Sequence, residues 1–293
     1  MRGTELERHM NVIDSLKPHE NQRVMDLVAA AGVNVGPWAE TKGHAASNPA
    51  YCYEWAFIEH ARLVVLNVWH GEIQERDGQL SCDLNPRAWL EFGRRTATLR
   101  SSELSALSKR ATRMDQAIAY AFGEQLPIRL IVGAGPQRDL SDPESKTASR
   151  MKLRLLDPEP WSIQRYNLDT GACRLTRGTA PRYVDQFTAP EPHLPNQHEV
   201  TGKAWGRGRK VRDAALLRAA GKCEFCHQQG FRMVSGAIYL ETHHVVPLSE
   251  NGADHERNVV AICPNDHREA HHGERREAIR TDLLVMLARI YRR

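Results

Sequence analysis

The chain has 293 residues, a length that allows two domains of ordinary size. Its 41% hydrophobic and 26% charged residues are typical of globular proteins and exclude a largely disordered chain. The first ten residues, MRGTELERHM, have no apolar run behind their charges, and the longest apolar stretch, LVVLNVW, is too short to cross a bilayer. We therefore expect a cytoplasmic protein without a signal peptide or a membrane span.

The positive charge is concentrated toward the C-terminus. The formal net charge is +4, and residues 201–293 hold 16 Lys and Arg against 11 Asp and Glu, whereas residues 1–200 hold 24 against 25. A basic C-terminal third could meet phosphate groups, although a solubilising surface would have the same balance.

Helical and extended patterns alternate irregularly through the first 180 residues. Val24, Leu27, Val28 and Ala31 recur at helical spacing, and Gly32 is suited to end that helix. A second helix is expected over 101–125, where a Ser/Glu pair can cap the first turn. Strands are expected where β-branched or alternating residues dominate, over 50–59, 62–75, 127–135 and 151–158. The mixture lacks a regular βαβ alternation and predicts an α+β fold.

A hairpin and a linker follow. Residues 161–178 read as two strands joined around Asp169-Thr170-Gly171, and residues 178–210 are rich in Pro, Gly and polar side chains. We expect an α+β recognition domain over 1–180, a basic linker over 181–210 and a second domain over 211–293.

Aromatic residues are unusually dense in one part of the first domain. Trp38 precedes the stretch NPAYCYEWAF, whose alternation would place Tyr51, Tyr53 and Trp55 on one face of a strand. Such residues form stacking walls around a base that is taken out of a duplex. The alternative is an ordinary aromatic sheet core.

The C-terminal domain contains closely spaced Cys and His residues. Cys52, Cys82 and Cys173 are scattered and read as buried thiols, but the other three cysteines cluster with histidines after residue 220. A strand over 238–248, a turn, a strand over 258–262 and a helix over 264–272 predict a ββα unit.

The histidine spacing in this unit is typical of a metal site. His267 and His271 are four residues apart and share a helix face, and the first strand can present His243 to the same point. His244 then points the other way and is free to act as a base, while Asn258 can fix the loop between the strands. A metal ion and a general base are what phosphodiester hydrolysis requires.

These residues closely resemble the HNH (ββα-metal) nuclease family. The motifs CEFC, LETHHVVPLSENGADHERN and AICPNDHREAHHG carry the resemblance, which covers about residues 211–273. It implies His244 as general base, Asn258 as the loop-positioning residue, and a catalytic divalent ion (Mg²⁺, Mn²⁺ or Ni²⁺) held by His243, His267 and His271. Glu241, two residues before His243, could orient a ligand or be a plain surface residue.

The resemblance also implies a separate structural zinc site. Cys223, Cys226 and Cys263 stand where the family has three of its four cysteines, but the fourth position holds Asp266. Zinc accepts a carboxylate oxygen, although a thiolate is the softer and stronger donor. We expect Zn²⁺ bound by three cysteines and Asp266. His227 as a substitute ligand, or no zinc at all, are the alternatives.

Basic residues precede the ββα unit. Arg207, Arg209 and Lys210 lie in a glycine-rich segment that could follow a phosphate backbone or be a solvated linker. An N-terminal domain followed by an HNH unit is similar to modification-dependent restriction endonucleases, so we expect cleavage of double-stranded DNA whose modification the first domain senses. One HNH unit cuts one strand, and double-strand cleavage would imply a homodimer or two visits.

Two other functions fit the sequence. One is an HNH nuclease without modification sensing, of the homing or defence type. The other is a non-catalytic DNA-binding protein held together by metal, which the presence of both His244 and Asn258 disfavours.

Overall fold

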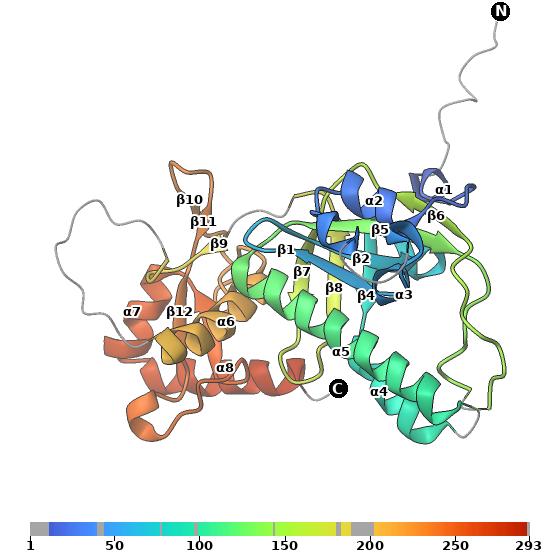
Figure 1. Cartoon of the computed structure of the whole chain (residues 1–293). Coiled ribbons are helices and arrows are strands. Elements are labelled where there is room, and N and C mark those ends of the chain that lie inside the picture. The colour runs from blue at the N-terminus through green and yellow to red at the C-terminus, as the bar shows by residue number, and fades with distance from the viewer. Residues whose placement is uncertain are drawn as a thin grey trace, which may run out of the picture. The chain divides into compact units, whose positions relative to one another are not determined.

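The computed structural model describes residues 12–39, 44–76, 78–96, 99–142, 144–179, 183–188 and 202–291, the side chains of 202–207 excepted. The chain divides into two compact units, 1–180 and 181–293. Both mix helices with strands (Figure 1), and the predicted α+β class is confirmed.

An eight-stranded sheet forms the centre of the N-terminal unit. Its strands are β1 (Ala56–Glu59), β2 (Leu63–Trp69), β3 (Ile73–Arg76), β4 (Gln79–Leu84), β5 (Ile128–Ala134), β6 (Leu153–Leu156), β7 (Trp161–Tyr166) and β8 (Cys173–Arg177). They lie in the order β1-β2-β5-β7-β8-β4-β3, with β6 also paired to β5. Strands β2 and β5 are parallel and every other pair is antiparallel.

The helices of this unit pack on the sheet or on one another. They are α1 (Val12–Ser15), α2 (Val24–Ala30), α3 (Pro49–Cys52), α4 (Pro86–Arg95) and α5 (Ser101–Glu124), with 3-10 turns η1 (Gly36–Ala39), η2 (Ala45–Ser47) and η3 (His70–Glu72). Val65 packs in a core cluster with α2, whereas its neighbours Val64 and Leu66 point to the opposite face and are also buried. Helix α5 packs on β1 and β2, and Figure 1 shows it running along the sheet.

Most elements predicted for this unit are confirmed. Helix α2 ends before Gly32, which has φ of +103°. At the start of α5 the Glu103 carboxylate accepts the Arg100 backbone N–H (2.9 Å), so Arg100, not a serine, is the N-cap of the predicted Ser/Glu pair's helix. The hairpin of β7 and β8 also forms. The predicted strand over 62–75 is interrupted by η3, which separates β2 from β3.

The predicted strand over 50–59 is wrong in its first half. Asn48 accepts the Ala50 backbone N–H (3.0 Å) and Pro49 occupies the first helical position, so residues 49–52 form α3 and the strand begins only at Ala56. Tyr51 and Tyr53 therefore do not share a strand face. The Asn-Pro pair outweighs the alternation of aromatic residues.

The C-terminal unit holds the ββα element. Strands β12 (Glu241–His244) and β13 (Val259–Ile262) pair antiparallel, and helix α7 (Pro264–His272) follows directly, with Pro264 at its first position. The predicted strand over 238–248 is divided, because β11 (Ile238–Tyr239) belongs to another sheet, of order β10-β11-β9. The remaining elements are β9 (Tyr183–Val184), β10 (Phe231–Arg232), the 3-10 turn η4 (Leu248–Glu250), α6 (Gly202–Ala219) and α8 (Arg276–Ile290).

The segment predicted as a linker, 181–210, contains regular structure at both ends. Strand β9 pairs with β11, and helix α6 begins at Gly202 and includes the glycines that we read as loop residues. Buried apolar residues on α6, among them Ala215 and Leu216, anchor the helix in the unit. Tertiary packing thus outweighs the low helix propensity of glycine.

Candidate active site

The two strands and α7 bring three histidines together. His243 is buried on β12, and His267 and His271 lie one turn apart on α7, with the three ring centroids 4.7–5.1 Å from one another. One nitrogen of each ring lies within 4.8 Å of the other two. The structure thus groups the three residues predicted as ligands of the catalytic ion.

The distances in this cluster fit a metal centre. Nε2 of His267 lies 3.2 Å from Nε2 of His271. Two nitrogens bound to one ion at about 2.0–2.1 Å would be about 2.9–3.4 Å apart, from octahedral to tetrahedral angles. Burial, and then the neighbouring His267 and His271, lower the pKa of His243 to about 3. The neutral imidazole that a metal requires is therefore favoured at His243.

Glu241 holds one of these histidines. Its Oε2 contacts Nδ1 of His267, and its Oε1 accepts a hydrogen bond from the Tyr239 hydroxyl (3.1 Å). A carboxylate can only accept, so Nδ1 of His267 carries the hydrogen and the Nε2 lone pair faces the cluster. Of the two readings of Glu241, the structure favours the one in which it orients a ligand.

His244 points away from the cluster, as the alternation of a strand requires. Its Nε2 lies 3.1 Å from Oδ1 of Asp254 in the loop between the strands. If Nε2 donates to this carboxylate, Nδ1 keeps the lone pair that a base needs. Sequence reasoning missed Asp254, because nothing in a turn sequence tells which of its polar residues folds back onto the strand.

Asn258 closes the loop that carries Asp254. Its Oδ1 accepts the Val246 backbone N–H (2.8 Å), and its Nδ2 donates to the carbonyls of Val246 (2.8 Å) and Ala253 (2.9 Å). The side chain is buried. This geometry is the one that a loop-positioning residue needs.

A second cluster contains Cys223, Cys226, Cys263 and Asp266, whose ligating atoms lie within 4.8 Å of one another. The thiols of Cys226 and Cys263 are 3.9 Å apart, and the Cys223 thiol donates to Asp266 Oδ2 (3.0 Å). Two sulfurs on a tetrahedral zinc, each about 2.3 Å from the ion, would be about 3.8 Å apart. The four side chains therefore fit a zinc ion. His227 is not part of this cluster in the described part of the chain.

Burial and mutual contacts shift the pKa values in this second cluster. Burial, together with the Asp266 contact, raises the pKa of Cys223 to about 11. Burial alone would raise the pKa of Asp266, but hydrogen bonds from the three thiols outweigh it and lower that pKa. Zinc would replace the thiol protons, so binding should release protons and strengthen with pH.

The basic segment and the aromatic residues are only partly placed. The side chain of Arg207 lies outside the described residues, Arg209 lies 3.6 Å from Asp213 one turn along α6, and Lys210 is half-buried. Whether these three residues bind DNA stays a prediction.

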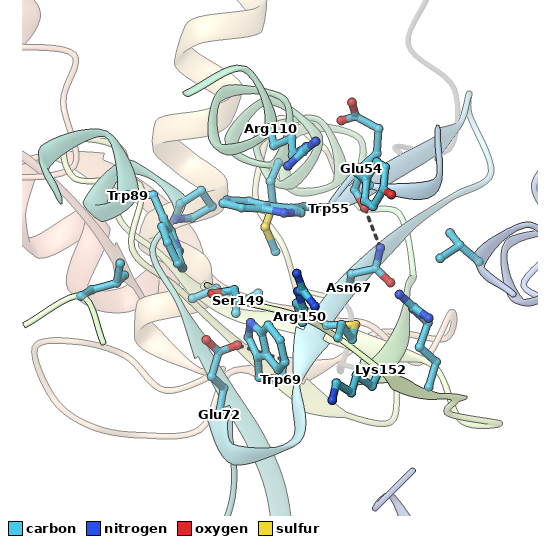
Figure 2. Close-up of a pocket in the computed structure, with 18 of the residues that line it drawn as sticks. Glu54, Trp55, Asn67, Trp69, Glu72, Trp89, Arg110, Ser149, Arg150 and Lys152 are labelled. Carbon is cyan, nitrogen blue, oxygen red and sulfur yellow. Dashed lines mark hydrogen bonds between the residues drawn. The ribbon is translucent and has the colours of Figure 1, made fainter. Parts of the chain in front are cut away.

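The aromatic residues predicted to wall one pocket separate into two groups. Trp38 is buried in the α2 core and stacks on Tyr51, with ring centroids 4.7 Å apart. Of the four, Tyr53 and Trp55 line the pocket of which Figure 2 is a close-up, and Trp55 is labelled there. Trp38 is therefore a core residue, Tyr51 packs half-buried against that core, and neither lines the pocket that contains Tyr53 and Trp55.

Comparison with known proteins identifies the C-terminal domain. Residues 223–273 match the HNH endonuclease family. Over 97 residues, 33% of this chain and 35% of the relative, the chain is 38% identical to the Type IV methyl-directed restriction enzyme EcoKMcrA of Escherichia coli (strain K12). The chain thus covers about a third of the length of this relative. It contains a C-terminal HNH domain that is homologous to part of that enzyme.

Two solved structures are similar to larger parts of the chain. The Type IV phosphorothioation-dependent restriction endonuclease ScoMcrA is 14% identical, with 62% of this chain and 44% of that chain covered and a TM-score of 0.27. The modification-dependent TagI restriction endonuclease is 15% identical, with 89% and 79% covered and a TM-score of 0.25. At these TM-scores neither likeness bears on the fold.

Among the helices of the described residues, none is both long and apolar enough to span a membrane.

Proposed function

We propose that this chain is a metal-dependent endonuclease that hydrolyses phosphodiester bonds in double-stranded DNA and acts on modified DNA. The observation that carries the proposal is the arrangement of the ββα unit. Three imidazoles meet at one point, and a fourth, His244, is held on the other side of the strand by Asp254. A base beside a cation site is the minimal apparatus for this hydrolysis.

In the proposed reaction His243, His267 and His271 hold a divalent ion, which when bound supplies charge stabilisation at the scissile phosphate. Nδ1 of His244 takes a proton from water as the water oxygen forms a bond to phosphorus. The bond to the leaving oxygen breaks, and that oxygen takes up a proton. Asp254 keeps the imidazole in the required tautomer and stabilises its protonated form.

The second cluster has a structural role in this proposal. Zinc bound by Cys223, Cys226, Cys263 and Asp266 would join the loop after α6 to the first turn of α7, which carries His267. Its loss would first lower stability and then displace that ligand.

Dependence on modification rests on the homology to a methyl-directed enzyme and on the presence of a separate N-terminal unit. A fold comparison alone would not carry it, because function lies in sites rather than folds.

Plasmid cleavage tests the proposal. The full chain would be incubated with Mg²⁺, Mn²⁺ or Ni²⁺ and with DNA containing either cytosine or 5-methylcytosine. His244→Ala should abolish cleavage, and His272→Ala is the matched control because His272 is an exposed histidine on α7 outside the cluster of three. Cleavage of methylated DNA alone supports the whole proposal, whereas equal cleavage of both substrates removes the modification dependence. DNA binding without any cleavage would favour a non-catalytic DNA-binding protein.

A further inference from the structure

The proposed function leaves unexplained a pocket of about 1070 Å³ in the N-terminal unit. Its wall is built from the loop before β1, from β2 and η3, from the start of α4, from α5, and from the segment 149–154 that leads into β6. Figure 2 shows Trp55, Trp69 and Trp89 around this space. This volume is close to the largest found for small-molecule sites, so the pocket has room for a whole nucleotide.

The three tryptophans are only half-buried. The rings of Trp55 and Trp89 are 5.2 Å apart at 58° to each other, so they form a corner instead of a filled stack. Trp69 comes from the end of β2, and its backbone N–H donates to the Glu72 carboxylate (3.2 Å), which fixes the turn that presents it. Three large rings left open to a cavity are suited to receive a flat ligand between them.

Hydrogen-bond acceptors without partners stand on the same wall. Nδ2 of Asn67 donates to the Glu54 carbonyl (2.7 Å), but Oδ1 of Asn67 is buried and has no partner in the described structure. One carboxylate oxygen of Glu54 contacts Arg113, and the other is also buried without a partner. Buried acceptors are normally satisfied. These two oxygens are closed off from solvent here, and they would gain a partner if the Asn67 and Glu54 side chains turned toward an N–H donor in the cavity.

Cations lie at the pocket as well. Arg150 and Lys152 are exposed on the segment before β6, and Arg110 lies over the ring of Tyr53 (5.5 Å), which is itself exposed. Among the acids that line the pocket, Asp83 is paired with Arg174 (2.6 Å). Positive side chains beside an aromatic cavity are suited to the phosphates that flank a nucleotide.

From this combination we propose that the pocket receives a single nucleobase extruded from duplex DNA, a base with an exocyclic amino group such as cytosine and its modified forms. The inference rests on the proposed function and deepens it, since this pocket would read the modification. The tryptophans stack on the base, Asn67 and Glu54 accept from its amino group, and Arg150 and Lys152 contact the phosphates on either side.

The test measures binding of the full chain, in the His244→Ala background, to long DNA in which every cytosine is 5-methylcytosine, and to the unmodified DNA. Trp69→Leu should remove the preference for methylated DNA and weaken its binding by about 5- to 150-fold, the range for loss of one base–aromatic stack. Lys152→Ala should weaken binding to both DNAs alike. It should also reduce the slope of log K against log salt concentration by about one, because one phosphate contact is lost. Lys17→Ala, an exposed lysine that does not line the pocket, should change neither.

A third DNA distinguishes extrusion from reading in a groove. Replacing guanine by hypoxanthine removes one hydrogen bond from each pair with methylcytosine. Extrusion then costs less, so binding should tighten by roughly fivefold. Trp69→Leu should lose this gain.

The outcomes separate this inference from the proposed function. Suppose that the wild type prefers or cuts methylated DNA, and that Trp69→Leu and Asn67→Leu are folded by circular dichroism. If both variants keep the preference for methylated DNA, the pocket inference is wrong while the proposed function stands. If wild type has no preference but the hypoxanthine gain and its loss in Trp69→Leu remain, then modification dependence fails and base extrusion is supported. Absence of the hypoxanthine gain in wild type overturns extrusion.

Discussion

Asn258 offers the sharpest test of how the active site is held together. Asn258→Ala removes three hydrogen bonds, two to Val246 and one to Ala253, which close the loop between β12 and β13. That loop carries Asp254, the partner of His244. The substitution touches none of the three clustered histidines.

The structure sets the size of the effect. At a net value of roughly 0.5–1.5 kcal/mol for each hydrogen bond, the variant should lose about 1.5–4.5 kcal/mol of unfolding free energy. A loop that no longer holds Asp254 misplaces His244, and a displacement of about 1 Å can lower the rate on the order of 100-fold. Asn258→Asp has nearly the same size but turns an oxygen toward the two carbonyls, so we expect it to be at least as harmful.

The assay combines cleavage rate, denaturant unfolding and calorimetric binding of Ni²⁺. Cleavage and stability should fall while Ni²⁺ affinity stays unchanged, because His243, His267 and His271 keep their places. Asn265→Ala is the matched control, since Asn265 is exposed on α7. An Asn258→Ala protein that cleaves at the wild-type rate, or that loses Ni²⁺ binding, would refute the reasoning.

Three further predictions concern side chains that support the site. Glu241→Gln should weaken Mn²⁺ binding by about 10- to 100-fold in calorimetry, because the charged partner of His267 is lost; equal affinity would contradict that role. Asp266→Cys should bind zinc more tightly in chelator competition, and removal of zinc should lower the stability of the C-terminal unit in both proteins; no gain in affinity would show that Asp266 is not a ligand. Arg218→Met should lower the unfolding free energy by about 3–5 kcal/mol in denaturant unfolding, because the Glu224 carboxylate, 2.6 Å away, would be left buried without its cation. The double variant Arg218→Met with Glu224→Leu should recover most of this stability.

The C-terminal site could be predicted to a large extent from sequence because its signals are local. His267 and His271 share a helix face through the helical repeat alone, and His243 and His244 point apart because successive strand residues do. Pro264 marks the start of α7. Spacing along the chain was therefore enough to predict which of these side chains share a face of α7 and which point apart on β12.

The N-terminal unit was less predictable because its short apolar stretches are ambiguous. Alternating aromatic residues favoured one strand over 50–59, but the Asn-Pro pair at 48–49 starts a helix instead. Trp38 then stacks on Tyr51 within the core. Periodicity alone does not separate such cases, since burial depends on which distant element covers the residue.

The sequence by itself determined the ββα element, its histidine cluster and the group of three cysteines with Asp266. The tertiary structure decided the partners that lie far apart in the chain: Glu241 on His267, Asp254 on His244, and the pocket whose tryptophans come from three separate elements. The physical reason is that local spacing fixes only which face of one helix or strand a side chain occupies. The packing of whole elements fixes which faces meet.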